Sequence, residues 1–248
     1  MGQRLVLSVR NIKTGTVLAN VYKHWSAYTG CAIDETNTFI DAFNNWMNEH
    51  PGDKGIFNRV DDEAVNRQKE IVIMVMMEAW PGACPAGFKE DVDEEDEEND
   101  PDAGKKYAAN VKMLLMSMGM MELVSKLDDE FSYDRNEGLI GITDSGIENY
   151  QSWSEGDVDV GIDAQGEVKE VYFGVIWGES YQEALEEEES EADLLDCMYE
   201  TDFVNNDDFG AFSLDDWYEF VEIYDKAQSA HKYKLGSKKN DAVWSFIE

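Results

Sequence analysis

Basic residues are scarce in this sequence. Its 248 residues include 20 lysines and arginines against 54 aspartates and glutamates, which gives a formal net charge of −34. Proteins that bind nucleic acids through the phosphates need clustered lysines and arginines to replace counterions, and this sequence has no long basic stripe. We therefore expect no direct nucleic-acid binding. A chain this acidic instead attracts basic surfaces on other proteins over long distances.

Cysteines, histidines and long apolar runs are also few. The three cysteines, Cys31, Cys84 and Cys197, are odd in number and widely spaced, which indicates reduced thiols in a cytosol-like compartment. Three scattered histidines without a Cys-x-x-Cys pair argue against a structural zinc site. The longest apolar segments, 71–77 and 111–124, are too short or too polar to span a bilayer, and the first residues form a strand pattern rather than a signal peptide. We expect a cytoplasmic protein without a membrane partner.

Motifs that are typical of enzymes are missing as well. The sequence has no Walker A motif, no G-x-G-x-x-G after a strand, no G-x-S-x-G elbow and no H-E-x-x-H motif. Residues 134–138 do not fit an EF-hand, because the glycine comes one position early and a third alternate ligand is absent. The sequence therefore predicts a non-enzymatic protein with no catalytic residues, no cofactor and no metal site.

The clearest pattern that the sequence does contain lies in residues 138–178, which predict a central β-meander. In one strand three apolar residues alternate with three aspartates: Val158, Val160 and Ile162 with Asp157, Asp159 and Asp163. Residues 163–166 supply a turn, and the return strand again keeps its apolar side chains on one side. One face of this sheet is expected to be buried, and the other to hold a rigid row of aspartates toward water or a partner.

The remaining patterns predict a hairpin and several helices. Residues 3–10 and 16–22 predict an N-terminal β-hairpin around a turn, and apolar residues at helical spacing predict helices over 34–48, 61–80, 103–127 and 213–231. Asp61 or Asp62 is the expected cap of the second of these helices, and Ser213 that of the last. The third helix carries five methionines, which we assign to the core, with an adaptable binding groove as the alternative: Met113, Met116, Met118, Met120 and Met121. The expected fold class is α+β, a single domain over 1–248 with a mixed or mainly antiparallel sheet and about four helices.

Two blocks concentrate the negative charge. Residues 90–102 and 179–200 each contain ten acidic residues and no basic one, and we interpret both as acidic insertions because like charges at this density resist packing. The other 34 acidic residues still outnumber the 20 basic residues, so acid is also in excess in the folded elements. Adaptation to high salt would spread the acid evenly and remove bulky apolar residues, whereas tryptophan, methionine and isoleucine are plentiful here.

This distribution favours an acidic surface that imitates the phosphate array of nucleic acid and binds a basic groove on another protein. Carboxylates reproduce the charge of phosphates, and arginine binds both groups in the same bidentate way. A solvated acidic coat without a specific role is the alternative. The candidate partner-binding residues are Asp93, Glu94, Glu95, Asp96, Glu97 and Glu98 in the first block, Asp157 and Asp159 on the aspartate face, and Glu186, Glu187, Glu188 and Glu189 in the second block.

A second candidate site is the loop after the N-terminal hairpin. It holds His24, Trp25, Ser26 and Tyr28, and aromatic loops on rigid elements are common recognition surfaces. His24 and Cys31 are also the one pair of base and nucleophile types that lie close together in the sequence. A small enzyme or ligand-binding protein with its site at this loop is therefore the rival hypothesis.

The opening MGQRL and the following stretch YKHWSAYTG, residues 22–30, resemble the start of uncharacterised proteins from phages of Gram-positive bacteria. The resemblance covers the N-terminal stretch alone and carries no catalytic residues. It implies expression inside a bacterial host, where acidic inhibitors that mimic DNA and block restriction, CRISPR or other defence enzymes are a known class. We therefore expect a phage-encoded inhibitor of a defence or nucleic-acid-binding protein, with a phage structural or assembly protein as a further alternative.

Overall fold

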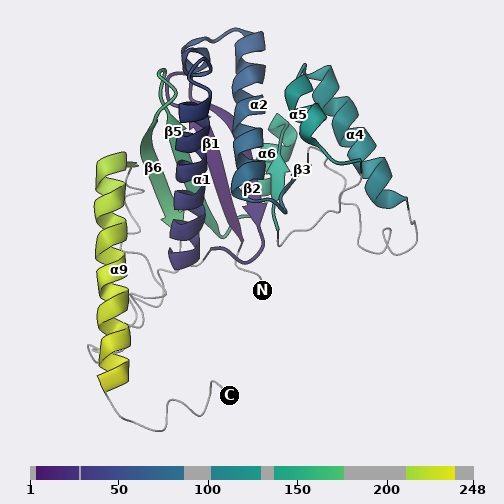
Figure 1. Cartoon of the computed structure of the whole chain (residues 1–248). Coiled ribbons are helices and arrows are strands. Elements are labelled where there is room, and N and C mark those ends of the chain that lie inside the picture. Colours follow the sequence, from purple (N-terminus) through teal and green to yellow (C-terminus); the bar gives the residue numbers. More distant parts are fainter. Residues whose placement is uncertain (1–3, 28, 87–101, 130–136, 176–210, 238–248) are drawn as a thin grey trace.

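A computed structural model describes residues 4–27, 29–86, 102–129, 137–175 and 211–237 (Figure 1). These residues form one seven-stranded mixed sheet with helices packed on it, which confirms the α+β class. The strands lie in the order β3-β4-β2-β1-β5-β6-β7. Their bounds are β1 (Leu5–Asn11), β2 (Thr16–Lys23), β3 (Cys84–Ala86), β4 (Leu139–Gly141), β5 (Gly156–Ile162), β6 (Val168–Val175) and β7 (Ala211–Ser213).

The N-terminal hairpin is confirmed and forms the centre of the sheet. β1 and β2 pair antiparallel, with Leu5 opposite Lys23. The turn between them uses Gly15 at φ 70°, a conformation that glycine adopts without steric cost. On its other edge β1 pairs in parallel with β5, so that Leu5 lies opposite Gly156. The two hydrogen-bonded partners of β1 therefore come from parts of the chain that are far apart in sequence.

The helices have the bounds α1 (Thr29–Glu49), α2 (Asp62–Ala79), α4 (Ala103–Ser117), α5 (Met121–Lys126), α6 (Asp144–Gln151) and α9 (Leu214–Ser237), with a short 3₁₀ turn η1 (Lys54–Asn58) before α2. The predicted caps are present at α2 and α9. The Asp61 carboxylate accepts a hydrogen bond from the Ala64 amide at 3.1 Å, and the Ser213 hydroxyl accepts one from the Asp216 amide at 3.2 Å. Each cap satisfies a backbone donor that has no partner within its helix.

The prediction of one helix over 103–127 was wrong. The helix is interrupted between α4 and α5. Gly119 takes φ 80° there, a conformation that ends α4. The break separates the methionines, so their assignment to the core holds only in part. Met120 is buried and Met118 packs against the core, whereas Met113, Met116 and Met121 are exposed.

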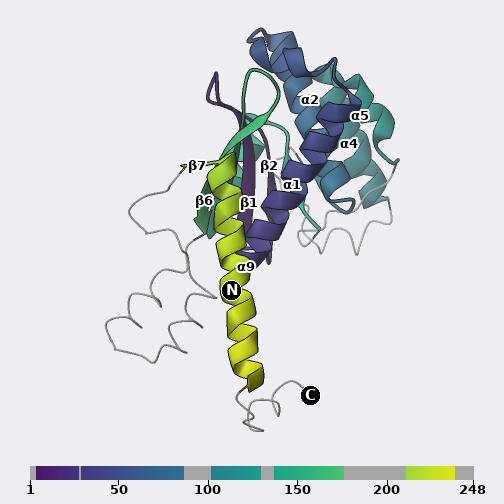
Figure 2. The same cartoon turned by 60° about the vertical axis from the view of Figure 1, so that its left-hand side comes forward.

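Most of the apolar core lies between the sheet and the pair α1–α2 (Figure 1). Alternate residues of the strands, such as Leu7 and Val160, point to this side and meet Phe39, Phe43 and Ile73 of the helices. α9 lies beside α1 at the β6 edge (Figure 2). The Trp217 indole of α9 donates a hydrogen bond to the Asn37 side chain of α1 at 2.8 Å, which fixes the two helices side by side.

The opposite face of the sheet is covered differently. α6 packs over β4 and β2, where Tyr22, Tyr150 and Trp153 form a small aromatic cluster. The Asn20 amide under it donates to the Ile147 carbonyl at 3.0 Å. On the β5–β6 side of the same face, the side chain of Asp157 is exposed and that of Tyr172 is half-buried. This part of the sheet places polar side chains at the surface.

The predicted β-meander is correct in its second half only. β5 and β6 form the expected hairpin, with Gly166 at φ 71° in its turn. Residues 138–151 instead form the short strand β4, which pairs with β2 and β3, followed by α6. The Thr143 hydroxyl accepts a hydrogen bond from the Gly146 amide at 3.1 Å and caps this helix. The buried pair Ile147 and Tyr150 has helical rather than strand spacing, which is the signal that the strand interpretation overlooked.

Candidate functional site

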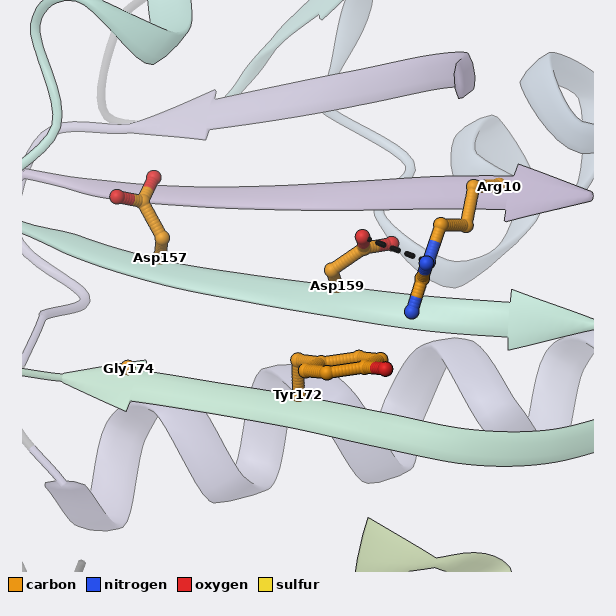
Figure 3. A pocket seen from close by; sticks show the side chains of 5 residues that line it. All are labelled: Arg10, Asp157, Asp159, Tyr172 and Gly174. Carbon is orange, nitrogen blue, oxygen red and sulfur yellow. Dashed lines mark ion pairs between the residues drawn. The ribbon is translucent and has the colours of Figure 1, made fainter. Parts of the chain in front are cut away.

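The polar face of the β5–β6 hairpin contains a hollow of about 310 Å³, shown in Figure 3. Five residues from three strands line it: Arg10 of β1, Asp157 and Asp159 of β5, and Tyr172 and Gly174 of β6. Strand register brings them together, because Asp157 lies opposite Gly174 and Asp159 lies opposite Tyr172. We call this site the β5–β6 hollow.

Arg10 is held firmly on one side of the hollow. Its Nε lies 2.8 Å from Asp159 Oδ2, and its Nη2 lies 2.9 Å from Glu170 Oε1. The guanidinium carbon is 4.3 Å from the centroid of the Tyr172 ring, within the range of a cation–π interaction. Burial lowers the pKa of Arg10, but a hydrogen bond to Tyr172 and the charges of Asp159 and Glu170 raise it more, so the pKa ends above its usual value. Arg10 is therefore always positively charged, and its guanidinium is held in place by Asp159 and Glu170.

The two aspartates of the hollow are costly to ionise. Desolvation raises the pKa of Asp159 to about 6; the charge of Arg10 lowers it and that of Glu170 raises it. Asp159 Oδ1 is buried without a hydrogen-bond partner, which agrees with poor solvation of the charge. Desolvation also raises the pKa of Asp157, against a hydrogen bond from Ser154. At neutral pH both carboxylates are therefore ionised at a cost to the folded state.

We expect the substitution Asp159→Asn to stabilise the protein at pH 7, by at most about 3 kcal/mol, and to have no such effect at pH 4. The pKa of Asp159 is higher in the folded state, about 6, than its ordinary value of 3.8. The folded state therefore binds the proton more tightly, and the wild type loses stability as the pH rises through this window. Urea unfolding of both proteins at pH 4, 5, 6 and 7 measures the difference.

The groups that face Asp159 are Arg10, Glu170, Tyr172 and Asp157, and all of them are present in both proteins of this comparison. Their own titration therefore largely cancels in the difference between variant and wild type. A stability difference that is the same at pH 4 and pH 7 would contradict the assignment. Destabilisation at pH 7 would show that the ion pair with Arg10 outweighs the desolvation of Asp159.

The structure changes the predicted row of aspartates. Asp157 and Asp159 do lie on one face, but Asp159 forms an ion pair with Arg10 rather than presenting a free charge. Asp163 does not belong to the row, because β5 ends at Ile162. Its carboxylate accepts hydrogen bonds from the amides of Gln165 at 2.8 Å and Glu167 at 3.0 Å and holds the turn instead.

Other predicted partner-binding residues lie outside the described part of the chain: Asp93, Glu94, Glu95, Asp96, Glu97, Glu98, Glu186, Glu187, Glu188 and Glu189. Four residues in or beside the hollow were not predicted. Glu170, Tyr172 and Gly174 alternate with the apolar residues of the return strand, so the period-2 pattern could have placed them on the aspartate face. No local signal indicated Arg10, because it reaches the site through the parallel pairing of β1 with β5.

The loop after the hairpin is held by hydrogen bonds. His24 Nδ1 lies 2.9 Å from the hydroxyl of Tyr22, and the Ser26 hydroxyl donates to Glu35 Oε1 at 3.1 Å. Trp25 is 53% exposed, with its ring edge-on to His24. Tyr28 lies outside the described residues. In the described part of this loop, Trp25 is the side chain best placed to contact a partner.

Cys31 does not have the environment of a catalytic nucleophile. Partial burial raises the pKa of its thiol, and the charges of Asp34 and Glu35 raise it further. Cys31 lies in the first turn of α1, where a helix N-terminus can lower the pKa of a thiol, but the pKa here is raised, opposite to the shift of a reactive cysteine. The structure therefore gives no support to the rival hypothesis of a Cys31 and His24 enzyme site.

A second acidic surface lies where α9 meets α1. Asp34 and Asp41 are exposed on α1, and Glu219 and Glu222 are exposed on α9. Burial raises the pKa of Tyr218, and the charge of Asp41 raises it further, so Asp41 of α1 lies near the Tyr218 side chain of α9. Over the whole described part of the chain, acidic residues outnumber basic ones by 28 to 16. Part of the acidic surface is therefore built on rigid elements.

Among the described residues, no three His, Cys, Asp or Glu side chains are grouped so that they could hold a metal ion. No helix in the same residues is long and apolar enough to cross a membrane. Comparisons with protein-family models, curated proteins and solved structures found no match to this chain. Its function has to be argued from the chemistry of the site.

Proposed function

We propose that this chain is a non-enzymatic, acidic interaction protein that binds a basic, nucleic-acid-binding surface of another protein. The observation that carries this proposal is the β5–β6 hollow. Three carboxylates lie in or beside it: Asp159 and Glu170 form ion pairs with the guanidinium of Arg10, and Asp157 lines the other end. Two of them have a raised pKa, and groups with perturbed pKa values in a surface hollow are candidates for a functional site.

The placement of these charges supports a specific surface rather than a solubilising coat. Asp157 and Asp159 stand on a strand in the interior of the sheet, hydrogen-bonded on both sides by β1 and β6. Their spacing is therefore fixed, at about 7 Å along the strand between alternate residues. A partner that carries arginines can recognise such fixed carboxylates as it recognises phosphates, through paired N–H donors.

A nucleic-acid-binding partner is consistent with expression in a bacterial host, which the N-terminal resemblance to phage proteins implies. In that setting the protein is a phage-encoded inhibitor, and the partner is a host defence protein or another nucleic-acid-binding protein. The excess negative charge draws the basic groove of the partner toward the inhibitor and increases the rate of association. The inhibitor then occupies the groove that the nucleic acid needs.

The test uses the whole chain, immobilised and exposed to a bacterial lysate at low salt. A captured protein is then purified, and its dissociation constant is measured between 50 and 500 mM NaCl. We expect the affinity to fall by at least about tenfold over this range, because salt screens exposed charges. We also expect duplex DNA to compete for the captured protein. An affinity that does not change with salt, or no competition by DNA, would count against the proposal.

Two double variants with the same change in net charge separate a specific surface from a general coat. Asp157→Asn with Asp159→Asn alters the β5–β6 hollow, whereas Glu148→Gln with Glu78→Gln alters exposed positions on α6 and α2. We expect the first pair to weaken partner binding by about tenfold or more and the second by less than about threefold, since hot spots dominate binding energy. Equal losses would indicate that only the total charge matters.

A further inference from the structure

We propose that the β5–β6 hollow is the receptor for a single arginine side chain of the partner. This inference rests on the proposed function and deepens it, because it names the residue type that the acidic surface recognises. The site is a built hollow with walls of two kinds, carboxylate and aromatic, rather than a patch of acidic residues (Figure 3).

The shape of the hollow comes from one missing side chain. Gly174 lies directly opposite Asp157 in the β5–β6 register, so no side chain of β6 fills the space beside that aspartate. Tyr172, two residues earlier on the same strand, forms one wall, and Asp157 and Asp159 form another (Figure 3). The volume of about 310 Å³ is at the lower end of the range for ligand sites. It suits one long side chain better than a cofactor.

The charges in and beside the hollow select a cation. Asp157, Asp159 and Glu170 lie in or beside the hollow together with one cation, Arg10, so two negative charges are left without a balancing cation when all four groups are ionised. Arg10 cannot balance more of them, because Asp159, Glu170 and the Tyr172 ring already fix its position. In Figure 3, Asp157 lies at the end of the hollow away from Arg10. The vacant end is therefore the acidic end.

Arginine fits this end better than lysine does. A guanidinium is planar and directs N–H donors along two edges, so it can bridge two carboxylates that stand about 7 Å apart along a strand. An ammonium group acts as a point charge and pairs well with one of them. The side chain of Asp159 is 31% exposed but its Oδ1 is buried, so an incoming donor shares Oδ2 with Arg10, whereas the exposed Asp157 can accept a donor of its own. The Tyr172 ring, which lines the hollow, adds an apolar contact for a weakly hydrated guanidinium.

The direct test is a titration of the full, ¹⁵N-labelled chain with three peptides at low salt, followed by NMR. The peptides are acetyl-Gly-Arg-Gly-amide, the same peptide with lysine, and the same peptide with citrulline, which keeps the shape of arginine without its charge. We expect the arginine peptide to shift the amide signals of residues 156–159 and 172–174 in a saturable way. We expect at least fivefold weaker binding of the lysine peptide and no saturable binding of the citrulline peptide.

The variant Gly174→Val fills the hollow without changing any charge, and valine is well suited to a strand. We expect it to weaken the arginine peptide by at least tenfold. Gly55→Val is the matched control, because a Cβ atom added there meets nothing within 4 Å, and it should bind like the wild type. Circular dichroism establishes that both variants are folded. Should Gly174→Val not fold, Asp157→Asn replaces it, with an expected loss of at least fivefold.

The inference is overturned if the arginine peptide shifts signals evenly over the acidic helices, if it binds Gly174→Val as well as the wild type, or if lysine binds equally. These results leave the proposed function standing, because the affinity for the purified partner is measured separately against salt. The opposite case is also distinguishable. Saturable binding of the arginine peptide in the hollow would support the subsite, and a partner affinity that does not change with salt would at the same time contradict the proposed charge mimic.

Discussion

Replacing Glu70 with alanine is expected to lower the free energy of unfolding by about 3–5 kcal/mol. Glu70 lies on α2 and is only 5% exposed. Its Oε2 is 2.8 Å from Arg67, and its Oε1 accepts hydrogen bonds from the backbone amides of Glu122 at 2.9 Å and Leu123 at 3.0 Å. One carboxylate thus satisfies the first amides of α5 and fastens that helix to α2. Alanine leaves those amides and Arg67 without this acceptor.

Urea unfolding followed by tryptophan fluorescence measures this loss. Glu78→Ala is the control, because Glu78 is exposed on the same helix and its removal should change stability by less than about 0.5 kcal/mol. Glu70→Gln keeps an acceptor oxygen but loses the charge, so its effect should lie between the two. A loss below about 1 kcal/mol for Glu70→Ala would mean that water replaces the carboxylate and that α5 is held by its apolar contacts.

The second large effect is expected at Trp217, the anchor of α9. Trp217→Ala should cost about 3–5 kcal/mol, as large-to-small changes at fully buried aromatic residues do. The side chain is 0% exposed and packs against Phe173 of β6, with ring centroids 5.3 Å apart. Its Nε1 also donates to Asn37 Oδ1 at 2.8 Å. The substitution therefore removes both the packing and the polar link between α9 and the rest of the fold.

Limited proteolysis distinguishes local release of α9 from a general loss of stability. We expect Trp217→Ala to be cleaved within α9 under conditions in which the wild type is resistant, because the helix detaches more often. Tyr218→Ala is the matched control, since the neighbouring ring is 44% exposed. Trp217→Phe should lose only about 1–2 kcal/mol, because it keeps an aromatic ring but leaves Asn37 without its donor. Equal cleavage of Trp217→Ala and Tyr218→Ala would contradict the anchoring role.

Local patterns predicted the local structure well. The alternation in β5, the turn at 163–166 and the caps Asp61 and Ser213 depend on interactions between near neighbours, and the structure has all of them. The strand prediction was wrong at α6, a short helix within the predicted β-meander. In α6, eight residues give too few turns for the 3.6-residue period to stand out, and the capping residue Thr143 is also common in strands.

The candidate site was half predictable for the same reason. The aspartates were visible because they alternate with valines, whereas their cation, Arg10, comes from a strand far away in the sequence. The parallel pairing of β1 with β5 that joins them depends on the tertiary fold, which period-2 patterns do not specify. The sequence predicted a row of equivalent aspartates, whereas in the folded protein Asp159 is paired with Arg10 and Asp157 is exposed.

The central position of β1 has a consequence for how the chain acquires its fold during synthesis on the ribosome. β1 and β2 can close as a hairpin early, but the second edge of β1 stays unpaired until β5 has been translated, because this edge pairs with β5, with Leu5 opposite Gly156. Pairings between strands so distant in sequence slow folding, since the intervening chain must first be closed into a loop. Until then the nascent hairpin exposes an apolar strand edge to other nascent chains and to chaperones.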